Sequence, residues 1–100
     1  MTWVFVGAMK VNFHATLRQI TGRKTVEFDL PGGTTVDGLL AAVVERYPEM
    51  REELLHEDGT LLGHVHVFIN GRDAPYLERK LATPLEEADT VDVFPAVAGG

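Results

Sequence analysis

The 100-residue chain contains no cysteine and no serine. Without cysteine it cannot form a disulfide, a thiolate zinc site, an iron–sulfur cluster or a cysteine nucleophile. Without serine it cannot form a Ser-His-Asp triad. No apolar run in the sequence approaches the ~20 residues that a membrane-spanning helix needs. These absences exclude several classes of enzyme and metalloprotein.

Basic residues are also scarce: nine Lys and Arg stand against fifteen Asp and Glu, which gives a formal net charge of −6. Nucleic-acid binding needs a basic face that releases counterions, and adsorption to anionic lipid needs one as well. We therefore expect no nucleic-acid partner and no membrane partner, whereas a basic protein partner stays open. The length predicts one domain, and the 45% of apolar residues can form its core.

The first eight residues are apolar but lack a basic leader, so they are a poor signal peptide. We predict an N-terminal extension over residues 1–8, a folded domain over residues 9–95 and a C-terminal tail over residues 96–100. The alternative for the first boundary is a first strand that simply starts before Met9.

Alternating apolar residues predict strands over Lys10–Leu17 and Lys24–Leu30, joined by a turn at residues 21–23. A third strand is predicted over Val65–Ile69, and the Asn70-Gly71 pair after it is typical of a tight hairpin turn. We expect a weak returning strand or loop over residues 72–77 and a last strand that contains Val91, Val93 and Pro95.

Between the second and third strands the apolar spacing changes to that of an amphipathic helix, from Val36 to Tyr47. Thr34 or Thr35 is suited to cap its start, and Pro48 ends it. A second, short helix is predicted over residues 49–55. Two strands, a crossing helix and later strands predict an α+β roll with one main helix packed on a mixed sheet, which is the β-grasp or ubiquitin-like fold.

Motifs for catalysis and metal binding are weak. The chain has neither the phosphate-binding nor the dinucleotide-binding glycine motif. His64 and His66 would share one face of a strand, but no third ligand has a predictable position. We interpret them as surface or interface histidines and predict no metal site.

The strongest functional signal is the end of the sequence, Ala98-Gly99-Gly100, directly after the last strand. At ~7% glycine usage, two terminal glycines arise by chance roughly one time in two hundred. A tail without Cβ atoms can thread a narrow channel and present its carboxylate to an enzyme. Pro95 fixes the direction in which the tail leaves the sheet.

Several segments resemble the MoaD branch of the MoaD/ThiS ubiquitin-like sulfur carriers. They are Met9-Lys10-Val11-Asn12-Phe13-His14-Ala15-Thr16-Leu17-Arg18, Thr35-Val36-Asp37-Gly38-Leu39-Leu40, Tyr47-Pro48, Val67-Phe68-Ile69-Asn70-Gly71-Arg72 and Phe94-Pro95-Ala96-Val97-Ala98-Gly99-Gly100. The resemblance covers residues 9–100. It implies a cytoplasmic protein that is a cosubstrate or small subunit rather than an enzyme.

The resemblance also implies a chemistry for the tail. Gly100 would be adenylated by an ATP-dependent, E1-like enzyme of the MoeB/ThiF type and converted to a thiocarboxylate, while Pro95, Val97, Ala98 and Gly99 would lie in the partner's channel. The carrier itself would bind no cofactor, because the ATP is used by the activating enzyme. Its acceptor would be a molybdopterin precursor in a MoaE-like large subunit.

Other functions stay open. The usual MoaD tail has a second proline where this chain has Ala96. The Pro-Ala-Val-Ala-Gly-Gly end also resembles carriers that supply sulfur for cysteine synthesis. A ubiquitin-like modifier would instead form an isopeptide through Gly100, and a plain interaction module would make no use of the tail.

The strand phase predicts where partners dock. If the core residues of the first, third and last strands point inward, then His14, His66, Phe68 and Phe94 point outward. In the β-grasp arrangement they would form one exposed patch on the sheet face away from the helix, beside the root of the tail. Two exposed phenylalanines are typical of an interface. Alternatively, the N-terminal extension or a loop covers them.

Overall fold

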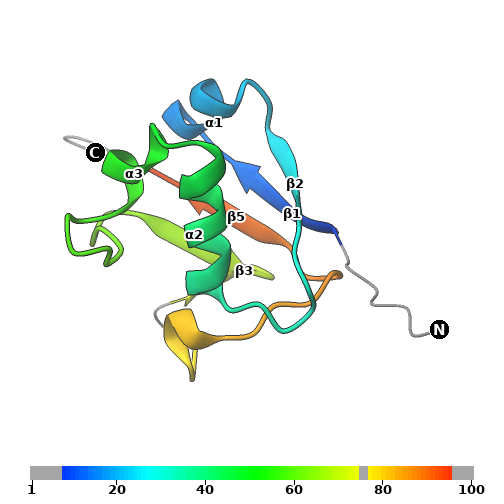
Figure 1. Cartoon of the computed structure of the whole chain (residues 1–100). Helices are drawn as coiled ribbons and strands as arrows, with labels where there is room; N and C mark the ends of the chain where they lie inside the picture. The colour runs from blue at the N-terminus through cyan, green and yellow to red at the C-terminus, as the bar shows by residue number, and fades with distance from the viewer. Residues whose placement is uncertain (1–7, 75–76, 96–100) are drawn as a thin grey trace.

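The computed structural model describes residues 8–74 and 77–95. It contains a five-stranded sheet with a helix lying across one face (Figure 1). The elements, in chain order, are β1 (Ala8–Phe13), α1 (Thr16–Thr21), β2 (Thr25–Asp29), α2 (Val36–Arg46), α3 (Met50–Leu54), β3 (His66–Ile69), β4 (Arg72–Asp73), η2 (Lys80–Ala82) and β5 (Val91–Phe94).

The strand order in the sheet is β2-β1-β5-β3-β4. The last strand, β5, thus lies in the middle, parallel to β1 and antiparallel to β3. The β1–β2 and β3–β4 pairs are antiparallel hairpin neighbours. A mixed sheet of this order with a helix on one face confirms the predicted β-grasp fold.

The core lies between the sheet and α2. Alternate strand residues are buried, among them Val11, Phe13, Val91 and Val93, each at most 1% exposed. Helix α2 contributes Val36, Leu39, Leu40 and Val43 to the same core. The opposite face of the sheet carries no helix among the described residues (Figure 1).

The predicted start and end of the main helix are confirmed. The Thr35 hydroxyl oxygen accepts a hydrogen bond from the Gly38 N–H at 3.1 Å, which satisfies one of the unpaired donors of the first turn. Asp37 lies in that first turn and complements its partial positive charge. The helix ends at Arg46, and the short helix α3 lies within the predicted residues 49–55.

The predicted first strand is wrong after Phe13. The chain leaves β1 at Ala15, whose φ is 54°, and then forms the one-and-a-half-turn helix α1. Leu17 is fully buried, as the alternation required, but it reaches the core from a helix. At the other end β1 begins at Ala8, which pairs with Asp29, one residue before the expected domain boundary at Met9.

The predicted Asn70-Gly71 turn is confirmed. Both residues have positive φ, 53° and 84°, and they join β3 to β4 in an antiparallel hairpin. The weak returning strand is only two residues long. No helix in the described ranges is long and apolar enough to cross a membrane.

Candidate functional site

Four aromatic side chains gather on the sheet face opposite α2. We call His14, His66, Phe68 and Phe94 the aromatic patch. The strand order brings them together, because β5 lies between β1 and β3 and His66 is paired directly with Phe94. Phe94 is 36% exposed and is the one exposed large hydrophobic side chain in the described part of the chain. The predicted outward phase of these residues is confirmed.

The four rings contact one another in sequence. The His14 ring stacks on the Phe94 ring, with centroids 4.1 Å apart and planes 7° from parallel. Phe94 meets Phe68 edge-on at 5.5 Å and 89°, and Phe68 lies 5.9 Å from His66. The aromatic patch is therefore continuous from the residue after β1, across β5, to β3.

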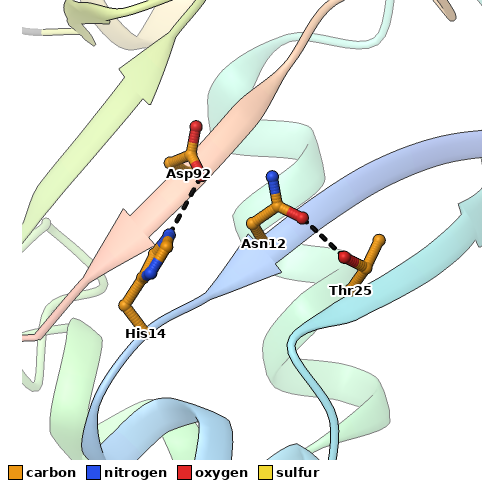
Figure 2. A network of polar contacts seen from close by, with 4 residues as sticks. All are labelled: Asn12, His14, Thr25 and Asp92. Atoms are coloured by element: carbon orange, nitrogen blue, oxygen red, sulfur yellow. Dashed lines mark hydrogen bonds and ion pairs between the residues drawn. The ribbon is translucent and has the colours of Figure 1, made fainter.

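Two carboxylates hold the histidines of the patch. His14 Nε2 lies 2.9 Å from Asp92 Oδ1, a contact between β5 and the residue that follows β1 (Figure 2). His66 Nδ1 lies 2.9 Å from Asp73 Oδ2. Beside the first pair, the Thr25 hydroxyl donates to Asn12 Oδ1 at 2.7 Å and links β2 to β1. These contacts fix the outer face across the sheet.

Asp92 and Asp73 are members of this site that were not predicted from the sequence. The phase of β5 alone places Asp92 on the same face as Phe94, two residues away. The sequence does not show the register of β5 against β1, and this register places the Asp92 carboxylate next to His14. Asp73 needs the register of the β3–β4 hairpin in the same way.

A shallow hollow adjoins the patch. Its volume is about 360 Å³, and Phe68, Gly71, Asp92 and Phe94 line it. The hollow therefore combines two aromatic rings with one carboxylate.

The structure does not bring metal ligands together. In residues 8–74 and 77–95, no three His, Asp or Glu side chains are grouped so that they could hold an ion. His66 contacts Asp73, and His64 lies outside β3. In the loop after α3, the hydroxyl and backbone N–H of Thr60 donate to the Asp58 carboxylate and lower its pKa.

The tail begins beside the aromatic patch. Pro95 is buried at the end of β5 and directly follows Phe94. The other predicted tail residues, Val97, Ala98, Gly99 and Gly100, lie outside the described residues. The described part of the chain therefore ends at a buried proline next to the aromatic patch.

A mixed sheet with a helix across one face and an open aromatic patch on the other places the protein in the ubiquitin-like class. The model of the ThiS family matches residues 11–100, and the chain belongs to this family of ubiquitin-like sulfur carriers.

Individual relatives span nearly the whole chain. Small archaeal modifier protein 3 of Haloferax volcanii is 36% identical over 92 residues, which cover 92% of this chain and 98% of the relative. The crystal structure of the BexX/CysO complex of Amycolatopsis orientalis contains a chain that is 31% identical, with a TM-score of 0.75 and coverage of 93% and 100%. A Pyrococcus furiosus protein, provisionally described as molybdopterin converting factor subunit 1, is 29% identical with a TM-score of 0.71 and coverage of 91% and 99%.

Proposed function

We propose that this protein carries sulfur on the carboxyl group of Gly100. The observation that carries the proposal is the family match through residue 100, together with a buried Pro95 that follows an exposed aromatic patch. A rigid root beside a docking surface would aim a Cβ-poor tail into a partner's active site. The carrier would thus act as a cosubstrate, and the catalytic groups would belong to its partners.

The proposed chemistry has two steps. A carboxylate oxygen of Gly100 attacks the α-phosphorus of ATP in an E1-like activating enzyme of the MoeB/ThiF type, which forms the acyl adenylate and releases pyrophosphate. Hydrosulfide then attacks the acyl carbon and displaces AMP. The product is a terminal thiocarboxylate, whose sulfur is passed on. ATP belongs to the partner, and the carrier binds no cofactor.

As the acceptor we propose a pyranopterin precursor of molybdopterin, held in a MoaE-like large subunit. The likeness to the Pyrococcus furiosus protein supports this acceptor. The alternative acceptor is an enzyme of cysteine synthesis, because the Pro-Ala-Val-Ala-Gly-Gly end resembles that of carriers which supply sulfur for this reaction.

A second candidate function is protein modification. The 36% identity to a small archaeal modifier protein favours it. In that case the Gly100 adenylate would be attacked by a lysine amine of a target protein, and an isopeptide would form with release of AMP. Both functions require the same first step at Gly100.

The test begins with the terminal glycine. The intact chain is incubated with its activating enzyme, ATP and a sulfur source, and its mass is measured. Exchange of one carboxyl oxygen for sulfur should add on the order of 16 Da. Deletion of Gly100 should abolish the gain with little effect on unfolding, because a chain terminus contributes little to the core.

The matched control is Ala98→Gly, which changes the tail but keeps its length and should still gain sulfur. Sulfur uptake by the chain without Gly100 would overturn the proposal.

In a second experiment, the natively expressed protein is isolated with its partners. A terminal thiocarboxylate with a MoaE-like subunit supports the molybdopterin acceptor, and Gly100 linked to a lysine supports the modifier.

A further inference from the structure

The hollow beside the aromatic patch has two chemically different walls. Phe68 and Phe94 present ring surfaces nearly at right angles, and Asp92 adds a carboxylate to the same lining. An aliphatic side chain would bury the carboxylate further without offering it a hydrogen-bond donor, which is unfavourable. A side chain with an apolar stem and a cationic head matches both walls.

The Asp92 carboxylate is oriented so that it can contact a cationic side chain. One of its oxygens, Oδ1, is 2.9 Å from His14 Nε2, which fixes the carboxylate on the outer face. Figure 2 shows the second oxygen directed away from His14. No hydrogen bond joins that second oxygen to the described residues. The side chain is 24% exposed, so a group from outside can reach it.

The surroundings favour a cation as well. The fourth lining residue, Gly71, has open space where a Cβ would be, so the hollow stays accessible from the hairpin side. A larger groove on the same outer face is lined by Glu27, Glu87 and Asp89, with Lys10 as its one basic residue. The nearest basic residue along the hairpin, Arg72, is paired with Ile69, so it belongs to the opposite face of the sheet.

We propose that this hollow is a socket for an arginine or lysine side chain of the activating enzyme, whose cation binds Asp92 and packs on the rings of Phe68 and Phe94. This inference rests on the proposed function. The protein itself contains an example of a cation packed on aromatic rings. The Arg46 guanidinium lies 5.4 Å from the ring centre of Phe28 and 5.5 Å from that of Tyr47. Arginine fits better than lysine, because its planar guanidinium can stack on a ring while it donates to a carboxylate.

The first experiment uses Asp92→Asn, which keeps the shape and removes the charge. Pyrophosphate exchange by the cognate activating enzyme is measured against the concentration of the full-length carrier at low and high salt. We expect the KM for the carrier to rise about tenfold with kcat unchanged, because a charge-assisted contact is lost. Added salt should raise the KM of the unmodified carrier far more than that of the variant.

The matched control is Glu45→Gln, which removes one negative charge from the exposed helical side of the molecule. Its KM should stay close to that of the unmodified carrier. An unchanged KM for Asp92→Asn, with normal exchange activity, would overturn the socket and leave the sulfur-carrier function standing. Absence of exchange with the unmodified carrier would instead count against the proposed function.

A second experiment tests the socket without the enzyme. The full chain is titrated with N-acetyl-arginine amide and, separately, with N-acetyl-norleucine amide, while NMR signals of Phe68, Phe94 and the Gly71 amide are followed. We expect saturable shifts with the arginine compound that Asp92→Asn largely removes. Equal shifts with norleucine would identify an apolar socket, and no shifts with either compound would contradict the proposal.

Discussion

Ala15 has a backbone conformation that an L-residue rarely adopts. Its φ is 54° and its ψ is −128°, and it lies between His14 of the aromatic patch and the first residue of α1. A non-glycine residue at positive φ stores strain, typically about 1–3 kcal/mol. The strain is compensated by the neighbours, because Leu17 is fully buried on one side and the His14 N–H donates to the Val93 carbonyl on the other.

Ala15→Gly should therefore stabilise the protein. Glycine adopts this conformation without a Cβ clash, but it adds about 0.4–1 kcal/mol of backbone entropy to the unfolded chain. We expect the free energy of unfolding, measured with urea, to rise by about 1 kcal/mol. Ala41→Gly in the exposed middle of α2 is the control and should lower it by about 1 kcal/mol. Equal destabilisation by both substitutions would show that Ala15 is not strained.

At the level of the elements, period and turn chemistry predict most of the fold. Helix α2 and the β3–β4 hairpin depend on local signals, a 3.6-residue apolar spacing and an Asn-Gly pair, and both are confirmed. Helix α1 was not predicted, because Ala15 and Leu17 continue the two-residue alternation of β1 by coincidence. Leu17 needs a buried position in either conformation, so burial alone does not distinguish a strand from a helix.

The aromatic patch, too, was predicted in part from local sequence signals and in part depends on contacts between distant segments. Strand phase places all four of its side chains on the outer face, and that follows from the sequence. The stacking of His14 on Phe94 and the contact of His14 with Asp92 depend on how β1 and β5 are aligned, a relation between segments about 80 residues apart. No local pattern specifies that alignment, so the contact of the Asp92 carboxylate with His14 could not be predicted from the sequence.

At the end of β5, a buried residue is followed directly by an exposed one. Substituting each of them tests whether the outer face of the sheet binds a partner. Val93 is fully buried and Phe94 is 36% exposed. Phe94→Ala should weaken binding of the activating enzyme by about 2 kcal/mol, as loss of a central interface anchor does. Its free energy of unfolding should fall by only about 1 kcal/mol, because the ring packs on His14 and Phe68 on the outer face of the sheet rather than in the core.

Val93→Ala is the matched control for that test. We expect it to lower the free energy of unfolding by about 2 kcal/mol and to leave the affinity of the folded fraction unchanged. Calorimetric titration with the activating enzyme and urea unfolding measure the two quantities. If Phe94→Ala unfolded the protein and kept the affinity of the folded fraction, Phe94 would be a core residue.

For the whole molecule, the described residues already form a closed core. Its buried hydrophobic residues run from Met9 to Val93 and come from all strands except β4, from α1, α2 and α3, and from the connecting segments at Val65, Ala74 and Leu85. The acidic balance of the chain, −6 overall, suits a partner with a basic docking surface. The match to the ThiS family begins at residue 11, so the family likeness does not depend on the residues before β1.

A chain that starts at Met9 should therefore fold and accept sulfur normally. Removal of residues 1–8 deletes the Ala8–Asp29 pair at the end of the β1–β2 ladder, and we expect the free energy of unfolding to fall by less than about 1 kcal/mol. Met9→Ala in the full-length chain is the sensitive control, because Met9 is 2% exposed and its truncation should cost about 2–5 kcal/mol. Urea unfolding and the 16 Da mass gain measure both properties. A loss of several kcal/mol in the shortened chain would mean that Trp3 or Phe5 contributes the ~1.5–3 kcal/mol of a buried large apolar side chain, and the extension would then belong to the folded domain.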